Sequence, residues 1–221
     1  MALQINYLGQ SCFSLKGKEG IVITDPFDSK IGLNMPKVSA DLVTVSHQHP
    51  DHNAISRVAP TVRRDKPFIV DAPGEYEVAG ISVFGYPTFH DDKKGAERGP
   101  NIMYAIHLDG LVVVHLGDLG HALDDKTLEK LEKVDVLLVP VGGKFTIDAK
   151  TAVEVIRDIE PSYVIPMHYK TEQHQDPMFA DMGTVEDFMK AYGVTKEAVG
   201  SFSISAASLP EETELVVMKS V

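Results

Sequence analysis

The distribution of strand and helix patterns along the chain is the feature that most constrains its fold. In the first half, short apolar segments separated by Gly, Pro and Asp turns predict strands. In the second half, apolar strand segments alternate with helical patterns. This order favours an α/β protein (α+β type) with two sheets packed face to face and helices on the outer faces. We expect strands at Leu3–Leu8, Ser11–Leu15, Gly20–Thr24, Leu42–Ser46, Phe68–Val70, Ile81–Tyr86, Met103–Leu108, Leu111–Leu116, Val134–Pro140 and Tyr163–Met167.

Capping residues and turns place the other elements. The Asp109-Gly110 pair predicts a hairpin between two strands. No linker-like or low-complexity segment interrupts residues 1–221, so we expect a single domain. Buried strands run into Asp25 and into Asp118, which indicates two related halves. We expect helices over Asp125–Lys133, Ala149–Ile159 and Val185–Ala191, with N-caps at Asp124, Asp148 and Thr184.

Composition excludes several classes of protein. Acidic residues outnumber basic ones by 32 to 21, and the formal charge of -11 argues against a broad grip on nucleic acid. With Cys12 as the only cysteine, neither an intramolecular disulfide nor a thiolate metal cluster can form. Any metal must therefore be held by nitrogen and oxygen. No segment approaches the roughly 18 apolar residues of a membrane span, so we expect a cytoplasmic protein.

The segment Ser46-His-Gln-His-Pro-Asp-His52 directly follows an expected strand and therefore lies on a loop at a strand end. It reads H-x-H-x-D-H, a pattern far more specific than most short motifs. In a tight loop, the alternating His47 and His49 can converge on one cation, while Asp51 and His52 turn toward a second. The motif predicts two adjacent metal sites that share one loop.

Further ligands are expected at the ends of other strands, where a sheet edge presents them to the same place. His90, Asp118 and His168 all stand just beyond an apolar strand. Each cation needs such residues, because sites with zinc-like chemistry hold about four ligands including a water. A carboxylate can give one oxygen to each of two metals, which makes Asp118 the natural bridging ligand.

These motifs resemble those of the metallo-β-lactamase superfamily of metal-dependent hydrolases. The H-x-H-x-D-H motif, His90, the Gly117-Asp118 pair and Pro166-Met-His-Tyr169 follow the order of the superfamily's motifs. Within it, the chain is similar to the small branch that includes the ascorbate-6-phosphate lactonase-like proteins, and the resemblance covers roughly residues 3 to 192. The segments similar to that branch are Gly9-Gln-Ser-Cys-Phe13, Asp25-Pro-Phe27, Gly74-Glu-Tyr-Glu77 and Val141-Gly-Gly143.

The resemblance implies a four-layer αββα sandwich with a dinuclear site at one edge of the two sheets. Asp25 is similar to a strand-end aspartate that orients the histidine loop without binding metal. Nitrogen and oxygen ligands suit Zn, Mn or Fe. The lactonase-like branch implies Mn, and the wider superfamily implies Zn. The resemblance implies a first site of His47, His49 and His90, a second of Asp51, His52 and His168, and Asp118 as their bridge.

Residues near the expected ligands are candidates for other roles. His121 lies three residues after Asp118, so it either faces the cavity as an acid or caps the helix that follows. Arg98 and Lys144 are either plain surface residues or the cations that bind an anionic substrate. Arg98 belongs to the polar loop Asp91–Pro100, which is either a solvated connection or a lid.

Other polar residues are expected to be structural. His107 and His115 lie inside strands and are expected on sheet faces, outside the site. Glu75 and Glu77 are expected in a turn.

The leading hypothesis is a metal-dependent hydrolase, in which a water activated by two cations attacks a carbonyl carbon or a phosphorus. Asp118 would position this water and accept its proton. The expected substrate is an ester, lactone or phosphoester of a small molecule, which either carries a phosphate group or lacks one. The alternatives are a phosphodiesterase or nuclease, against which the acidic charge counts, and a metal-binding protein without catalysis.

The expected partner is a small-molecule substrate, and neither nucleic acid nor a membrane is expected. The lactonase-like relatives imply homo-oligomers. The apolar C-terminal run Leu215-Val-Val-Met218 is either a strand for pairing with another copy or an inner edge of the second sheet.

Overall fold

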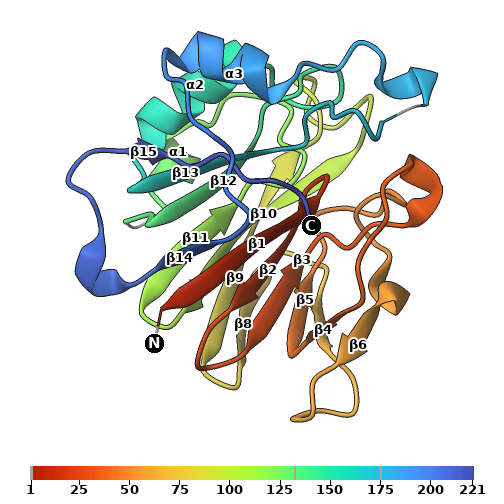
Figure 1. The fold of residues 1–221 in the computed structure, drawn as a ribbon, viewed down its shortest axis with the longest axis vertical. Coiled ribbons are helices and arrows are strands. Elements are labelled where there is room, and N and C mark those ends of the chain that lie inside the picture. The colour runs from red at the N-terminus through yellow and green to blue at the C-terminus, as the bar shows by residue number, and fades with distance from the viewer. Residues whose placement is uncertain (1, 132, 175) are drawn as a thin grey trace.

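The computed structural model describes residues 2–131, 133–174 and 176–221. Its strands form two large sheets and one small sheet (Figure 1). The helices are α1 (Asp125–Leu128), α2 (Ala149–Ile159) and α3 (Val185–Tyr192), with 3-10 turns η1 (Ser29–Ile31), η2 (Ile55–Arg57), η3 (Pro177–Phe179) and η4 (Ala206–Ser208). The strands are β1 (Leu3–Gly9), β2 (Cys12–Lys16), β3 (Ile21–Thr24), β4 (Val38–Ala40), β5 (Leu42–Thr44), β6 (Val58–Pro60), β7 (Phe68–Val70), β8 (Gly74–Val78), β9 (Ile81–Phe89), β10 (Pro100–Leu108), β11 (Leu111–His115), β12 (Val136–Pro140), β13 (Tyr163–Met167), β14 (Phe202–Ile204) and β15 (Glu214–Leu215).

The two large sheets combine antiparallel and parallel pairing. The first has the order β14-β1-β2-β3-β5-β7, and the second has the order β15-β13-β12-β11-β10-β9-β8. In the second sheet, β11, β12, β13 and β15 are parallel neighbours. Every residue of β12 is buried, as expected for a parallel strand covered on both faces. The ten strands expected from the sequence are all present, with ends that shift by a few residues.

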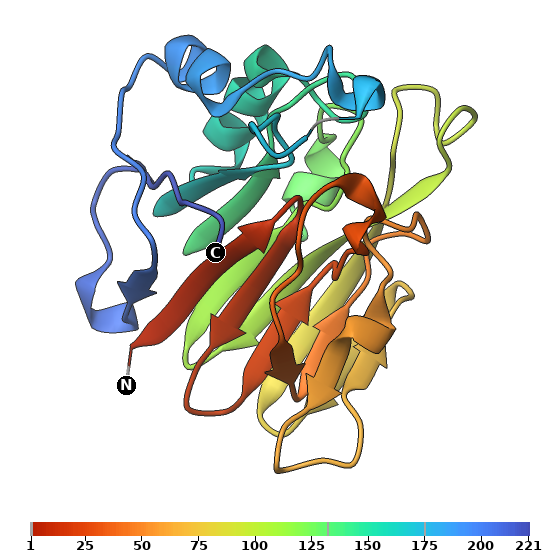
Figure 2. The same cartoon turned by 45° about the vertical axis from the view of Figure 1, so that its right-hand side comes forward.

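The main core lies between the two sheets (Figure 2). Tyr7 and Phe13 from the first sheet and Met103 and Tyr104 from the second are almost fully buried in it. The outer face of the first sheet carries a second cluster, in which Phe27 is buried against β2, β3 and β5. Here η1, η2 and the small sheet of β4 and β6 form the outer layer, whereas α2 and α3 lie beside the second sheet.

The expected helix caps and the expected hairpin are confirmed. Asp148 accepts a hydrogen bond from the Thr151 amide, and Thr184 forms a capping box with Asp187. Asp109 and Gly110 both have positive φ, as a two-residue hairpin turn requires.

The helix expected over Asp125–Lys133 is shorter in the structure. It ends at Leu128, because the amides of Lys130 and Leu131 bond to carbonyls three residues back and tighten the last turn. Residue 132 of the expected helix lies outside the described residues.

Several short strands differ from the sequence expectation. The turn expected at Glu75 and Glu77 is wrong, because both lie in β8, an edge strand paired with β9. Of the two possibilities for the C-terminal run, the inner edge is observed, since Leu215 pairs with Val164 of β13.

Within the described ranges, no helix has the length and apolarity needed to cross a membrane.

Candidate metal centre

The candidate ligands meet at one edge of the molecule because the strands before them end there. β3 and β5 are parallel neighbours in the first sheet, and β9 and β11 flank the antiparallel β10 in the second. Within each sheet, the carboxyl ends of these strands therefore point the same way. The residues brought to this edge are Asp25 after β3, the 47–52 loop after β5, His90 after β9, Asp118 after β11 and His168 after β13.

Asp25 fixes the orientation of the histidine loop. Its Oδ1 accepts a hydrogen bond from the Ser46 amide at 2.7 Å, and its Oδ2 accepts one from the Ser46 hydroxyl. The Nδ1 of His52 lies 2.9 Å from the same Oδ2, and the Nδ1 of His47 lies 2.9 Å from Ser46 Oγ. Because both Nδ1 atoms are engaged, both rings present Nε2 to the cluster.

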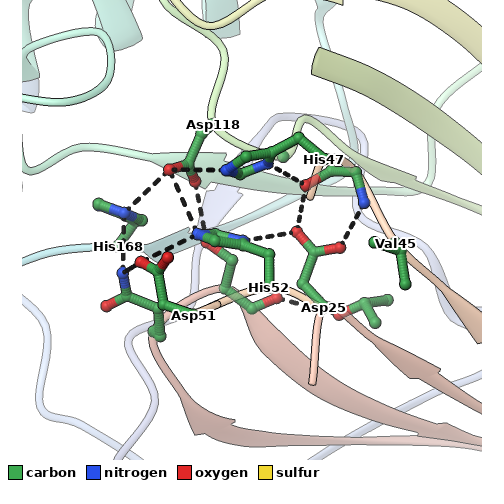
Figure 3. Close-up of polar contacts among 12 residues, drawn as sticks. Asp25, Val45, His47, Asp51, His52, Asp118 and His168 are labelled. Carbon is green, nitrogen blue, oxygen red and sulfur yellow. Dashed lines mark hydrogen bonds and ion pairs between the residues drawn. The ribbon is translucent and has the colours of Figure 1, made fainter. Parts of the chain in front are cut away.

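Histidine ring nitrogens surround the carboxylate of Asp118, and Figure 3 shows those of His47, His52 and His168. Its Oδ2 lies 3.9 Å from His47 Nε2 and 3.3 Å from His90 Nε2. The same oxygen lies 3.3 Å from His52 Nε2 and 3.1 Å from His168 Nε2. Three sets of side chains have ligand atoms within 4.8 Å of one another. The first ligand group is His47, His49 and His90, and the second is Asp51, His52 and His168. The remaining set, Asp25, His47 and His52, contains the aspartate that orients the loop and one histidine from each ligand group.

The electrostatics of this cluster suit a bound cation. Burial favours neutral imidazole and lowers the pKa of His47 to about 3. Burial also opposes ionisation of Asp118, yet His168 and His52 hold its pKa well below the usual range. The Nε2 atoms of His47 and His52 are buried and have no hydrogen-bond partner among the described residues. Burial alone would lower the pKa of His52, but Asp118 and Asp51 raise it well above the usual value, so a cation has to displace a proton from this ring. Imidazole nitrogens beside ionised carboxylates are the donor set that Zn, Mn or Fe takes, so the residues fit a divalent cation.

The backbone around Asp118 holds its carboxylate in place. The Asp118 amide donates to Asn101 Oδ1 at 2.9 Å, and Ser11 Oγ lies 3.4 Å from Asp118 Oδ1. Gly117 has a positive φ of 57°, and a Cβ there would lie 2.3 Å from Asn101 Oδ1. Only glycine fits this turn. The neighbouring His115 binds the Ser11 carbonyl and the Gly117 amide, so its ring supports the turn from outside the cluster, as expected.

Gln10 is a site residue that sequence reasoning missed. Its Nε2 lies 3.0 Å from Asp51 Oδ2 and 2.9 Å from His168 Nε2, two of the candidate ligand atoms. Its backbone carbonyl accepts the His168 amide at 2.9 Å. The side chain is 1% exposed, and its Oε1 has no partner among the described residues. Two signals were available in the sequence: Gln10 directly precedes the Ser11–Leu15 strand pattern, and it belongs to the Gly9–Phe13 segment that is similar to the lactonase-like branch.

His121 is not brought to the cluster. Its Nε2 accepts a hydrogen bond from the Phe89 amide at 3.2 Å, and its Nδ1 lies 2.7 Å from the Ala122 carbonyl. Both ring nitrogens are therefore occupied by backbone groups. The helix that follows is capped by Asp124, so His121 does not cap it either.

The two candidate cations for substrate binding lie in different surroundings. Arg98 lines the cavity that contains His90, Asp118 and His168, which has a volume of about 340 Å³. The Nη2 of Arg98 donates to the Lys144 carbonyl at 2.9 Å. Lys144 itself lines no cavity at the cluster, and its Nζ pairs with Asp181 at 3.2 Å.

The loop that carries Arg98 is organised by a buried carboxylate. Asp91 accepts hydrogen bonds from the amides of Lys93, Gly95, Glu97 and Arg98 at 2.7–2.9 Å. Burial alone would raise the pKa of Asp91, but these four N–H groups outweigh it and hold the pKa low. These hydrogen bonds hold the loop backbone in place and thereby fix the backbone position from which the Arg98 side chain extends.

The fold and the site define a known class of protein. Residues 4–168 match the family model described as a β-lactamase superfamily domain. The chain therefore belongs to the metallo-β-lactamase superfamily, and the fold and superfamily predicted from the sequence are confirmed.

Its relatives are metal-dependent hydrolases. One from Carboxydothermus hydrogenoformans is 30% identical over 217 residues, covering 87% of this chain and 94% of the relative. One from Methanospirillum hungatei is 34% identical, covering 76% and 84%. A crystal structure from Thermotoga maritima, assigned as a Zn-dependent hydrolase of the superfamily, is 36% identical with a TM-score of 0.78 and covers 98% of both chains. The chain is thus a metal-dependent hydrolase of this superfamily.

Proposed function

We propose that the protein uses two divalent metal ions to hydrolyse an ester, lactone or phosphoester of a small molecule. The observation that carries the proposal is the position of Asp118 Oδ2, within 3.9 Å of ring nitrogens from both ligand groups. A carboxylate placed in this way suits a bridge between two cations. The ligand chemistry supports Zn or Mn, with Fe as a third possibility.

When bound, such cations lower the pKa of a water molecule and polarise the carbonyl or phosphoryl oxygen of the substrate. The chain's own residues supply orientation and proton acceptance. Asn101 fixes the Asp118 backbone and Ser11 contacts its Oδ1, so the carboxylate is held ready to orient the attacking water and accept its proton. Arg98, at the wall of the same cavity, faces the substrate with a positive charge.

The test replaces one ligand from each group. The double variant His49→Ala, His52→Ala should lose its metal, measured by elemental analysis, and its turnover of esters, lactones and bis-p-nitrophenyl phosphate. His107→Ala is the matched control, because His107 lies on β10 outside both ligand groups. Retained metal and activity in the double variant would show that the ligand assignment is wrong. Circular dichroism of all variants checks that they fold.

A further inference from the structure

A second cavity adjoins the candidate metal centre. It has a volume of about 370 Å³, which lies in the range of about 300–1,000 Å³ typical of small-molecule sites. His49 and Arg98 line both this cavity and the one that contains Asp118 and His168. A molecule that reacts at the metal centre can therefore extend past these two side chains into the second cavity.

One side of this second cavity is apolar and rigid, whereas Ser46, the histidine loop, Asp71, Arg98 and Asn101 complete its lining. We call it the proline cavity, because Pro73, Pro87 and Pro100 line it together with Ala72 and Ile102. Proline has no N–H to donate and a fixed φ, so these walls offer little to polar groups and lose little entropy when a ligand binds.

Hydrogen bonds fix the shape of these walls. Pro87 of β9 is the register partner of Ile102 of β10. The Ile102 amide donates to the Ser46 carbonyl at 2.9 Å, which ties the strand to the histidine loop. The proline cavity is therefore held at a fixed position beside His47 and His49.

The charges around the two cavities do not suit a phosphorylated sugar. Among the described residues that line them, Arg98 is the only Lys or Arg side chain. Its guanidinium already donates to the Lys144 carbonyl, and Asp71 places a carboxylate at the proline cavity. Phosphate recognition commonly uses several charge-assisted donors, and sugar hydroxyls need polar partners. The polar side chains that also line the proline cavity are already engaged. Ser46 donates to Asp25, Asn101 donates to Thr88 Oγ1 and the Leu116 carbonyl, and Gln48 accepts from Asn53.

We propose that the proline cavity binds an alkyl or aryl group of the substrate, so that the protein hydrolyses apolar esters or lactones. The inference rests on the proposed hydrolytic function. In the reaction, water adds to the carbonyl carbon and the C–O bond of the ester breaks. An ester gives an alcohol and a carboxylic acid, and a lactone gives one hydroxy acid; in both cases the acid releases its proton to solvent. The apolar group stays in the proline cavity while the carbonyl lies at the metal centre.

The test compares matched substrates with the metal-loaded protein. Ethyl hexanoate is compared with ethyl acetate, and γ-nonalactone with γ-butyrolactone, using a pH indicator. Each buried methylene contributes about fourfold to binding, so the longer substrate should have at least about tenfold higher kcat/KM. Ala72→Trp, which fills the cavity, and Ala72→Glu, which charges it, should bring the long-to-short ratio close to one with metal content unchanged. Ala59→Trp on β6 is the control and should keep the wild-type ratio, because Ala59 lines neither cavity.

A binding measurement separates this inference from the proposed function. Saturation-transfer NMR with sodium hexanoate should show transfer to its terminal methyl group in the wild type and in Ala59→Trp, and loss of transfer in both Ala72 variants. If neither an ester, a lactone nor bis-p-nitrophenyl phosphate is turned over but this pattern is seen, the proposed function fails and the cavity's preference for apolar groups stands. The inference would be overturned if the wild type had nearly equal kcat/KM for the long and the short substrates. It would also be overturned if the wild type bound glucose 6-phosphate more tightly than hexanoate.

Discussion

At the scale of single residues, the orientation of each candidate ligand depends on its other hydrogen bonds. His47 and His52 are held through Nδ1 by Ser46 and Asp25. His168 has no such support, because its buried Nδ1 has no partner among the described residues. Its side chain is instead contacted by Gln10, which also donates to Asp51. The second ligand group therefore depends on an amide outside the histidine loop.

Replacing Gln10 should weaken metal binding at the second ligand group. Residues that support metal ligands typically contribute about 10–100-fold to affinity, so Gln10→Ala should lose affinity for one of two metals in that range. Competition with a chromophoric chelator measures the metal affinity of each variant directly. Gln48→Ala is the matched control, because Gln48 is exposed in the histidine loop and contacts Asn53. Equal affinities for Gln10→Ala and the wild type would show that the amide has no such role.

At the scale of elements, the segment between β13 and α3 forms one wall of the metal-centre cavity. Met178 and Phe179 of η3 line that cavity, and His174 packs on the Phe179 ring with centroids 4.8 Å apart. The Nδ1 of His174 accepts the Thr171 amide at 3.1 Å, and its ring is 6% exposed. A buried neutral imidazole thus supports this wall.

This arrangement predicts acid sensitivity of the protein. Burial lowers the pKa of His174 from 6.5 to about 4. Between these values the unfolded chain binds a proton that the folded chain does not, so stability falls as the pH falls through this window. With chelator present, His174→Gln should show a smaller fall in melting temperature than the wild type between about pH 7.5 and about pH 5. His107→Gln serves as the control, and an equal fall in all three proteins would contradict the assignment.

At the scale of the whole molecule, the candidate metal centre joins the two large sheets. Asp25 and the 47–52 loop follow strands of the first sheet, whereas His90, Asp118 and His168 follow strands of the second. A cation bound by both sets would link the sheets at the edge where each ends. The ligands therefore couple metal binding to the packing of the core between the sheets.

Metal removal should lower the stability of the whole fold. A ligand at about 100 times its Kd stabilises the folded state by about 2.7 kcal/mol, which for a chain of this size shifts the melting temperature by about 5–10 °C. Thermal unfolding in Zn or Mn, compared with unfolding in chelator, measures this shift. His90→Ala should reduce the shift, since it removes a ligand contributed by the second sheet. A melting temperature that does not respond to metal would contradict the coupling of binding to folding.

The sequence by itself determined the features that depend on local chemistry. The alternation of apolar residues set the ten expected strands, and the caps set the helix starts at Asp124, Asp148 and Thr184. The H-x-H-x-D-H motif identified candidate ligands because their spacing lies within one loop. The short edge strand β8 was missed, since its pairing with β9 and not its own pattern stabilises it.

Only the tertiary structure decided which distant side chains meet. Gln10 and His168 are separated by 158 positions, and the packing of β1 and β2 against the end of β13 brings them together. The same holds for His121, whose Nε2 accepts a hydrogen bond from the Phe89 amide, 32 positions earlier in the chain. The proline cavity is likewise lined by four segments that lie apart in the sequence, around His47, Ala72, Pro87 and Pro100. Contacts of this kind have no local signature, because they arise from how two sheets pack and not from the order of neighbouring residues.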